Sequence, residues 1–343
     1  MKMIYVSTLS TGPDRDSGWI YSFGELGWEV VSFSTIHKTA HGFVGKFQRR
    51  FNLSKANLKM QNSLIELVHK IKPRWVHFRL PIEFDRKTIE NIQNLGCFVT
   101  EYFNDDPFSS KSPFGLHWKF RKALSAYDGH FVYRPLNIDK FKSYGAKYVE
   151  HCPPTYDTKR HFLETAFADE TVLADVAFIG HWENDWRVKC LTSLKETGFH
   201  VILRGGGWDR AIQSGTLSSF SPVQHAFGEE YNKIYRNVIA GLCFFSKINR
   251  DAWTERALEI IAVGGVLVCE RTDEAQKYFI DGKEACFFST IEELIKIVKE
   301  LKEDPSKRIS IQQAGYKRLI AGNHTIKDRA IQVSKLVNSK IKE

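Results

Sequence analysis

The sequence predicts two α/β domains of the Rossmann type, each built on a parallel sheet. The chain of 343 residues is too long for one such domain and suits two of about 150 residues each. Short apolar, β-branched runs alternate with helical segments in both halves. A polar stretch between the halves, from Pro153 to Lys159, has the composition of a linker.

The first half reads as a series of strands separated by helices. Gly27 stands where a helix ends before a new strand, as glycine commonly does. The predicted strands cover residues 2–7, 28–33, 75–78, 97–102 and 131–133. Alternation at this spacing favours a parallel sheet with both faces covered by helices.

The second half restarts the alternation. Its predicted strands cover residues 175–180, 200–203, 240–245 and 266–269, and residues 187–197 are expected to be helical. Thr290 and Glu293 form a capping-box pattern at the start of a helix. A last amphipathic helix starts at Ile326. We therefore expect domains over residues 1–155 and 170–325, followed by a terminal helix over 326–343.

Composition excludes several classes of protein. A hydrophobic content of 43% is ordinary for a globular chain. The six cysteines include no C-x-x-C pair, so we expect neither a zinc site nor a redox motif. Cys97, Cys243 and Cys269 lie in apolar strand-like runs and are expected to be buried. The first residues enter a strand directly, without the pattern of a secretory signal. A cytoplasmic location is expected.

The net charge of +9 is unevenly distributed. Segment 38–60 contains no acidic residue and several basic ones, namely Lys38, Lys46, Arg49, Arg50, Lys55 and Lys59. This segment is a candidate contact with anionic lipid at the inner face of the membrane or with a polyanionic acceptor. The alternative is a solvated basic face. No nucleic-acid-binding module is recognisable, so nucleic acid is not expected as a partner.

Two glycine-containing strand ends in the second half are candidate phosphate sites. Gly180 and His181 follow a strand, and Arg187 lies early in the next helix, where it could bind phosphate oxygens. Gly205 and Gly206 follow the next strand and leave a wall without side chains, which could admit a phosphate or a sugar. The alternatives are a tight turn with a surface arginine and a flexible loop.

The stretch from Ser246 to Gly265 is the most informative. It reads as a strand end, a polar loop with Ser246, Asn249 and Asp251, and a helix with Arg256 and Glu259. Glu259 interrupts an apolar run, so its carboxylate needs a partner, and ribose hydroxyls are natural donors to it. The helix N-terminus and Arg256 would favour a diphosphate. The alternative for Glu259 is a partly exposed helix acid.

Four segments of the second half resemble the CgeB-like spore-protein glycosyltransferases, a branch of the GT-B superfamily. They begin with Asp175–Gly180 and Arg256–Gly265, and continue with Tyr278–Glu284 and Gly322–Thr325 before Arg329. The first half matches only loosely, through Tyr102–Asp106 and Tyr127–Gly129.

The resemblance implies a GT-B fold, with two Rossmann-like domains facing across a cleft and a last helix that returns to the first domain. It implies a nucleoside-diphosphate sugar, most simply a UDP- or GDP-sugar, bound by the second domain without a metal, with Glu259 on the ribose. In the retaining group a second acid stands eight positions earlier and touches the sugar. Here that position is Asp251, a shorter acid, and retention is favoured over inversion.

The acceptor is expected on the first domain. Asp105 and Asp106 follow the strand at 97–102, so either is a candidate general base, with a loop cap as the alternative. His41 and His77 are weaker candidates, and a histidine within a strand is more often a core residue. The first strand–helix loop offers further acceptor contacts at Asp14, Arg15, Asp16 and Gly18.

The leading hypothesis is a hexosyltransferase-like enzyme that transfers a sugar to a glycan, lipid or protein acceptor, as in polysaccharide biosynthesis. A nucleotide-sugar epimerase of the same architecture is one alternative. A coat or assembly protein that keeps the fold without the chemistry is another, and a basic surface-binding protein is the third.

Overall fold

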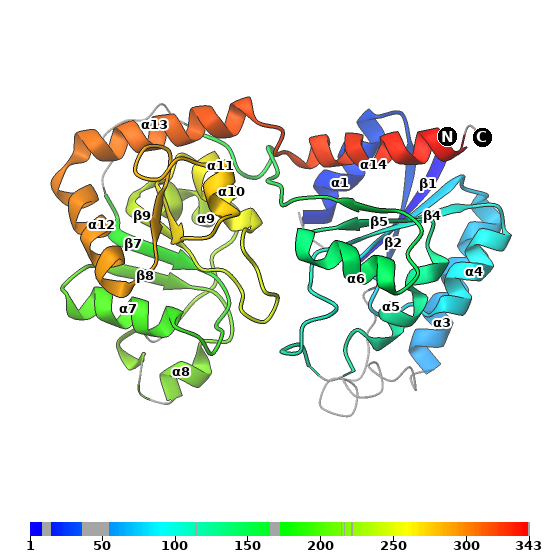
Figure 1. The fold of residues 1–343 in the computed structure, drawn as a ribbon, viewed down its shortest axis with the longest axis horizontal. Helices are drawn as coiled ribbons and strands as arrows, with labels where there is room; N and C mark the ends of the chain where they lie inside the picture. Colours follow the sequence, from blue (N-terminus) through cyan, green and yellow to red (C-terminus); the bar gives the residue numbers. More distant parts are fainter. Residues whose placement is uncertain are drawn as a thin grey trace. The chain divides into compact units, whose positions relative to one another are not determined.

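The computed structural model describes residues 1–8, 15–35, 55–113, 115–164, 172–213, 215, 217–220 and 222–341. The chain forms two compact units (Figure 1). Unit 1 contains Met1–Pro153 together with Ile326–Glu343, and unit 2 contains Pro154–Thr325. The boundary therefore falls within the Pro153–Pro154 pair, where the chain has no amide hydrogens to extend a strand or helix.

Unit 1 is built on a parallel sheet with the strand order β2-β1-β3-β4-β5-β6. The strands are β1 (Lys2–Ser7), β2 (Glu29–Ser34), β3 (Trp75–Arg79), β4 (Phe98–Phe103), β5 (Gly129–Val132) and β6 (Val149–His151). Met3 on β1 lies opposite both Val30 and Trp75, so β1 is an interior strand. The predicted strands of the first half are found to within two residues, and β6 was not predicted.

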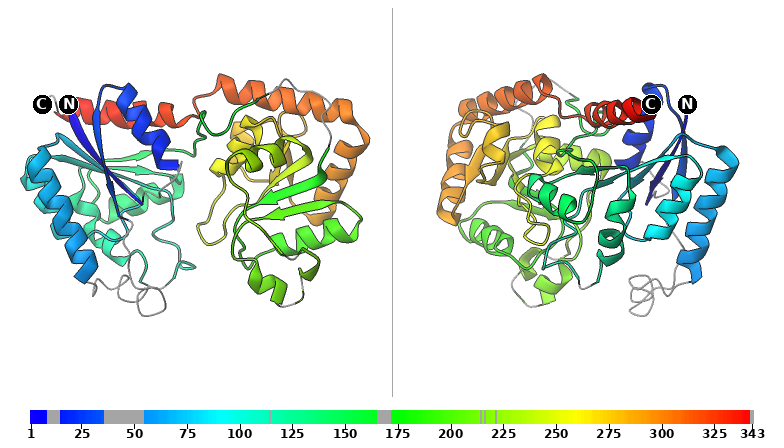
Figure 2. Two further views of the ribbon diagram at one scale, coloured as in Figure 1. Left: turned by 180° about the vertical axis from the view of Figure 1, so that it is seen from behind. Right: turned by 45° about the vertical axis from the view of Figure 1, so that its right-hand side comes forward.

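Helices cover both faces of this sheet, which both views in Figure 2 show. They are α1 (Arg15–Glu25), α3 (Lys55–Ile71), α4 (Arg86–Asn94), α5 (Trp118–Ala123), α6 (Ile138–Ser143) and α14 (Ile326–Ile341), with short 3-10 turns at Leu124–Ala126 and Pro135–Asn137. Helices α3 to α6 pack on one face against strand side chains such as Ile4 and Val76. Helices α1 and α14 pack on the other, against Met3 and Tyr5.

Helix α14 lies within unit 1, although it follows unit 2 in the chain. Its apolar residues recur at helical spacing and join the core formed by Trp19, Phe23 and Trp75, the members being Ile326, Ala330, Val333, Leu336 and Val337. Lys327 also forms an ion pair with Glu25 on α1, with 3.2 Å between Nζ and Oε2. The chain thus crosses between the units twice.

Unit 2 is built on a second parallel sheet, ordered β11-β10-β9-β7-β8. Its strands are β7 (Ala174–Ile179), β8 (Val201–Arg204), β9 (Val238–Cys243), β10 (Leu267–Glu270) and β11 (Cys286–Phe288). Its helices are α7 (Arg187–Glu196), α8 (Asp209–Gln213), α9 (Gly228–Arg236), α10 (Glu255–Ala262), α11 (Ala275–Tyr278), α12 (Ile291–Glu303) and α13 (Pro305–Ala321), with a 3-10 turn at Ser218–Phe220.

Alternate residues of β7 enter different cores. Ala177 and Ile179 pack with α9 and α10 on one face, and Val176 and Phe178 pack with α7 and α12 on the other. This two-sided burial explains why residues 176–179 form a continuous apolar run. The predicted cap of α12 is confirmed, because Thr290 Oγ1 accepts from the Glu293 amide at 3.1 Å. Two Rossmann-like parallel-sheet units are therefore the architecture, as predicted.

Candidate functional site

The strand order of unit 2 marks one place where a ligand would bind. The chain runs from β7 to β8 on one side of β7 and then to β9 on its other side. The loops that follow β7 and β9 therefore diverge, and ligands of open parallel sheets bind at the carboxyl ends of such strands. Unit 1 has the same reversal between β1 and β3. The predicted site residues should therefore lie near these two points.

Glu259 lies on α10, beside the switch point of unit 2. Its residue surface is 8% exposed, so its carboxylate is nearly buried, as the apolar run predicted. The hydroxyl of Tyr231 on α9 donates to its Oε2 at 2.6 Å. Burial and the neighbouring Glu259 charge raise the pKa of Tyr231 well above its ordinary value, which keeps that hydroxyl protonated as a donor. Glu259 is therefore a positioned carboxylate, and its contact with ribose stays a prediction.

Arg256 lies one helical turn before Glu259 and stands beside Gly180. A Cβ atom on Gly180 would lie 3.2 Å from both Cζ and Nη1 of Arg256. The guanidinium also lies over the ring of Phe178, with its Cζ 5.6 Å from the centroid. Its Nε is buried without a hydrogen-bond partner among the described residues. Gly180 is thus needed for this approach, and Arg256 places a cation at the end of β7.

The glycines after β7 and β8 have a packing role that the sequence did not predict. A Cβ on Gly205 would lie 2.0 Å from the Gly180 carbonyl oxygen, and Gly205 has a φ of +124°. The Gly180 amide donates to the Arg204 carbonyl at 2.9 Å. Gly206 packs against the rings of His181 and His225. Gly205 therefore lets the loop after β8 touch the loop after β7, and the binding of a phosphate or sugar at Gly205 and Gly206 stays a prediction.

Arg187 is also not the phosphate ligand that its position suggested. Its side chain is 4% exposed, and its Nε and Nη2 donate to the two carboxylate oxygens of Asp185 at 2.7 and 2.8 Å. Its Nη1 donates to the His181 carbonyl at 2.7 Å. The guanidinium therefore fixes the loop after β7 from inside and presents no fork to a ligand. The acid two residues earlier in the chain accounts for the difference.

The polar loop after β9 is compact. The Ser246 hydroxyl accepts from the Asn249 amide at 3.1 Å, and the Ser246 carbonyl accepts from the Asp251 amide at 2.9 Å. Asp251 is half-buried and lies close enough to the Cys243 thiol for its charge to raise the pKa of that thiol. Ser246, Asn249 and Asp251 are thus held at the carboxyl end of β9. Their contact with a donor stays a prediction.

Sequence reasoning missed a buried acid at the end of β10. Glu270 accepts from Trp186 Nε1 at 2.7 Å, from the Phe245 amide and from Lys247 Nζ at 2.7 Å. These donors come from the loops after β7 and β9, which are far from Glu270 in the sequence. No local pattern marks such a convergence, because it depends on which strands are neighbours.

In unit 1, Asp106 is fully buried and its Oδ1 accepts from the Phe108 amide at 3.0 Å and from Asn137 Nδ2 at 3.2 Å. Its prediction as a general base is wrong, because the carboxylate caps a turn inside the unit. Asp105 is half-buried and remains a candidate. Its charge acts on His117, a 2%-exposed residue that the sequence did not single out.

His117 lies against the ring of Phe103 at the end of β4, with 5.4 Å between centroids. Its Nδ1 is buried without a hydrogen-bond partner among the described residues. Burial lowers the pKa of His117, and Asp105 opposes that shift. At this strand end, the neutral imidazole of His117 is therefore a second group, beside Asp105, that can accept a proton.

The first strand–helix loop of unit 1 is only partly described. Asp14 and His41 lie outside the described residues, Arg15 begins α1, and Gly18 is buried within α1. Asp16 is 8% exposed and its Oδ1 accepts from Arg79 Nη1 at 2.5 Å and from the Tyr5 hydroxyl at 3.2 Å. Asp16 thus ties α1 to the switch point of unit 1, and its acceptor contact stays a prediction.

His77 is a core residue, as expected for a histidine within a strand. Its Nδ1 lies 2.8 Å from the Thr100 hydroxyl, and burial lowers its pKa to about 3 with a smaller contribution from Arg79.

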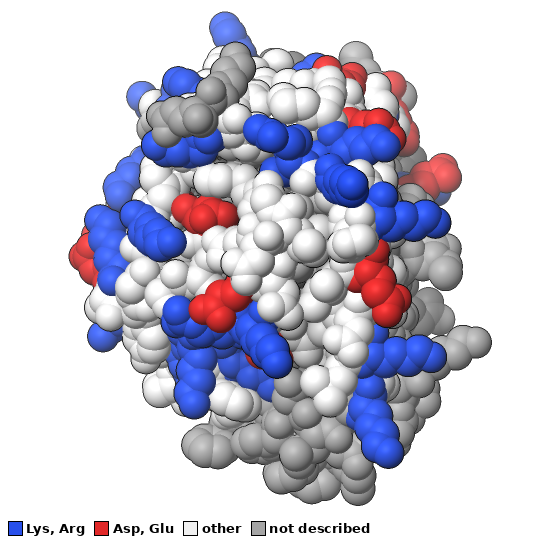
Figure 3. Space-filling view, turned by 90° about the vertical axis from the view of Figure 1, so that its right-hand side faces the viewer, with Lys and Arg blue, Asp and Glu red and all other residues white. Residues whose placement is uncertain are grey.

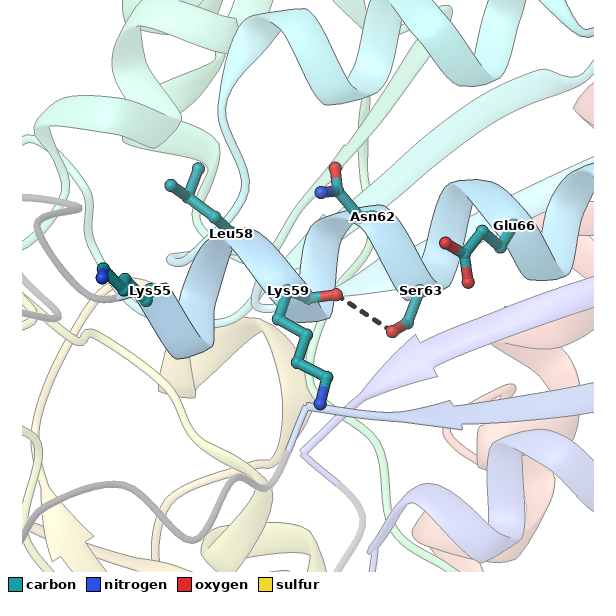
Figure 4. A pocket seen from close by; sticks show the side chains of 6 residues that line it. All are labelled: Lys55, Leu58, Lys59, Asn62, Ser63 and Glu66. Atoms are coloured by element: carbon teal, nitrogen blue, oxygen red, sulfur yellow. Dashed lines mark hydrogen bonds between the residues drawn. The ribbon is translucent and has the colours of Figure 1, made fainter.

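Of the basic segment 38–60, the described residues are those from Lys55 onward, at the start of α3. Lys55, Leu58 and Lys59 line a hollow of about 400 Å³ along the outer side of α3, together with Asn62, Ser63 and Glu66 (Figure 4). Leu58 is 49% exposed there. Among the described residues, no helix is long and apolar enough to cross a membrane, and no three His, Cys, Asp or Glu side chains are grouped as a metal site.

The architecture is the GT-B fold. A protein-family model described as glycosyl transferase-like matches residues 187–335, which include α10 with Arg256 and Glu259. The match covers less than half of the chain. No curated protein is significantly similar in sequence.

Solved structures match over the whole chain. Sucrose-phosphate synthase from Thermosynechococcus elongatus aligns with a TM-score of 0.71 and 11% identity, covering 100% of both chains. HepE from Anabaena in complex with UDP and glucose aligns with a TM-score of 0.65 and 10% identity, covering 99% of this chain and 100% of HepE. A proposed UDP-N-acetylglucosamine 2-epimerase from Listeria monocytogenes aligns with a TM-score of 0.57 and 10% identity, covering 99% and 96%. At these identities the likeness shows the fold alone.

Proposed function

We propose that this chain is a glycosyltransferase that takes a sugar from a nucleoside-diphosphate sugar held by unit 2. The observation that carries the proposal is the placement of α10. One turn of this helix brings Arg256 against Gly180 at the end of β7 and holds Glu259 nearly buried beside it. The glycosyl transferase-like family match over residues 187–335 includes both residues.

Each part of a nucleotide sugar has a partner of suitable chemistry in this proposal. The guanidinium of Arg256 and the N-terminus of α10 stabilise the diphosphate, because a cation and a helix N-terminus both favour negative charge. Glu259 accepts from the ribose hydroxyls. Asp251, eight residues earlier, lies nearer the sugar. We propose UDP- or GDP-sugars as donors, and the UDP and UDP-glucose complexes of HepE support the first.

The charge of the diphosphate is balanced in this proposal by Arg256 and the helix, so the reaction needs no metal ion. Retention is the favoured outcome, with Asp251 at the sugar. In an inverting reaction Asp105 would be the base that removes the proton from the acceptor hydroxyl, because Asp106 is occupied inside unit 1.

The proposal is tested by nucleotide binding and then by transfer. Thermal shift with UDP, GDP, ADP and dTDP measures binding, because a ligand that binds only the folded state raises its stability. Glu259→Gln should weaken binding of the preferred nucleotide roughly tenfold or more, as expected for loss of charge-assisted hydrogen bonds. Asp175→Asn is the matched control, since Asp175 is a 7%-exposed acid at the opposite, amino end of β7.

Turnover is then followed with the corresponding sugar donors. Release of the nucleoside diphosphate together with a new glycosidic bond, or slow donor hydrolysis, supports the proposal. A wild-type protein that neither binds any of these nucleotides nor consumes any donor would falsify it.

An epimerase is the second candidate, because the Listeria neighbour with that proposed activity shares the fold. It would change the configuration of the donor sugar without an acceptor. NMR of the sugar during incubation with the donor alone separates the two activities, since only an epimerase gives a new nucleotide sugar.

The acceptor is proposed to be anionic or to lie at an anionic surface. Unit 1 carries 27 basic and 16 acidic residues, whereas unit 2 carries 22 basic and 24 acidic ones, so the net charge is positive in unit 1 and slightly negative in unit 2. Lys and Arg side chains spread over the face of unit 1 that Figure 3 presents, while acidic ones are sparser. Such a surface attracts polyanionic glycans or anionic lipid.

This part of the proposal has its own test. The protein should sediment with vesicles that contain anionic phospholipid at low salt, and not with neutral vesicles or at high salt. Lys55→Gln combined with Lys59→Gln should reduce that sedimentation if segment 38–60 makes the contact. Equal sedimentation with neutral vesicles would contradict an electrostatic contact.

A further inference from the structure

Glu270 joins two loops at the carboxyl ends of the unit 2 strands. It is the last residue of β10, and its side chain is 6% exposed. Trp186 reaches it from the loop after β7, and the Phe245 amide and Lys247 reach it from the segment after β9. Because β9 lies between β10 and β7, one carboxylate fixes both loops that border the switch point.

Lys247 is the charged partner of Glu270 among the described residues, and its side chain is half-exposed. Its Nζ lies 2.7 Å from Glu270 Oε1, yet its side chain is 43% exposed. Its backbone amide donates to Glu183 Oε2 at 3.1 Å, which fixes the start of the side chain as well. An ammonium carries three N–H donors, and Glu270 uses one of them. Lys247 is thus held at its backbone amide and at its ammonium, while its side chain stays half-exposed.

Several charged side chains lie near the carboxyl end of β9. The Cys243 thiol at the end of β9 has a pKa raised to about 12, first by burial, with Arg256 opposing and Glu270, Glu259 and Asp251 adding to the rise. Three acids therefore lie near this strand end. Without compensation they would repel a diphosphate, and Arg187 is occupied by Asp185.

We propose that Lys247, positioned by Glu270, contacts the diphosphate of the donor directly. The inference rests on the proposed function, since it names a further ligand of the same donor. Arg256 then serves the phosphates from the end of β7 and Lys247 from the end of β9. Glu270 acts through Lys247 and is a positioning residue.

Calorimetric titration of the full chain with a nucleoside diphosphate and with the matching nucleoside tests the contact. Lys247→Met should weaken binding of the diphosphate about tenfold or more and leave binding of the nucleoside within about twofold, because a charge-assisted hydrogen bond is lost only where phosphate is present. The nucleoside and the thermal unfolding curve report whether the variant has kept its fold.

Lys302→Met is the matched control. Lys302 is 49% exposed and lies 2.9 Å from Asp175, a buried acid whose side chain is 9% exposed at the amino end of β7. It repeats the pairing of Lys247 with Glu270, but at the amino end of a strand instead of the carboxyl end. Its loss should leave both ligands bound as in the wild type.

The double variant Lys247→Met with Glu270→Gln separates contact from neutralisation. Diphosphate binding that stays weak in the double variant supports a direct contact. Binding restored by Glu270→Gln would overturn it, because Lys247 would then only offset Glu270. The proposal would also be overturned if Lys247→Met bound the diphosphate with the same affinity as Lys302→Met. A wild type that binds no nucleotide at all would instead count against the proposed function itself.

Discussion

Replacing Arg187 by methionine tests whether this arginine stabilises the fold or binds phosphate. The guanidinium is 4% exposed, and it makes a two-pronged ion pair with Asp185, whose side chain is 9% exposed. It also lies 3.5 Å from Glu183, which is 14% exposed. Arg187→Met therefore leaves two nearly buried carboxylates without their cation. Breaking a buried pair in this way costs about 3–5 kcal/mol.

That cost predicts a large change in melting temperature. For a unit of this size each kcal/mol shifts Tm by about 2–4 °C, so Arg187→Met should lower the Tm of unit 2 by roughly 6–20 °C. Differential scanning fluorimetry and urea unfolding measure the two quantities independently. Nucleotide affinity, measured well below Tm, should change far less than stability.

Arg271→Met is the control. Arg271 also pairs with two carboxylates, Asp281 at 2.6 Å and Glu293 at 2.7 Å, but its side chain is 30% exposed and those of its partners are 38% and 36% exposed. Solvent screens such pairs, so the expected loss is about 0–1 kcal/mol. If Arg187→Met is as stable as Arg271→Met but no longer binds nucleotide, the conclusion that Arg187 stabilises unit 2 and does not bind phosphate is refuted.

Two further predictions concern the packing of each unit. Gly205→Ala should destabilise unit 2 by about 2 kcal/mol or more in urea unfolding, because its Cβ would lie 2.0 Å from the Gly180 carbonyl oxygen. Gly24→Ala, at a helical position of α1 with open space around it, should instead gain a few tenths to about 1 kcal/mol, and equal effects would contradict the close approach. For His77, the folded-state pKa of about 3 lies below the ordinary 6.5, so the unfolded chain binds the proton first and stability falls as the pH drops through 6.5. Between pH 7 and pH 5 this contributes a loss of about 2 kcal/mol, which His77→Asn should abolish; an unchanged difference between the two pH values would show that other groups cause it.

Local patterns in the sequence predicted much of this fold. Apolar runs with both faces buried predicted β1, β7 and β10 within a residue or two, because the middle of a strand in a doubly covered sheet packs against apolar side chains on both faces. The cap at Thr290 could be predicted because it involves residues three positions apart in the sequence. The burial of Glu259 was readable as well, since helical spacing places its neighbours in the core.

The roles of single polar residues were harder to predict from the sequence. Arg187 and Asp106 both had the residue type and the position of ligand-binding groups, and both are bound inside their own units. A charged side chain at a strand end has the same sequence pattern whether it meets a ligand or a neighbouring loop. Only the path of the loop, which depends on packing, decides between them.

By itself the sequence determined that the chain has two parallel-sheet units and that α10 carries a buried acid one turn after an arginine. Tertiary structure alone decided which strands are neighbours, and therefore that Glu270, Trp186 and Lys247 meet at one place. The physical reason is the distance along the sequence between the residues that interact. Helices, caps and strand burial follow from interactions a few residues apart, whereas the carboxyl ends of β7, β9 and β10 are brought together by the packing of the whole sheet.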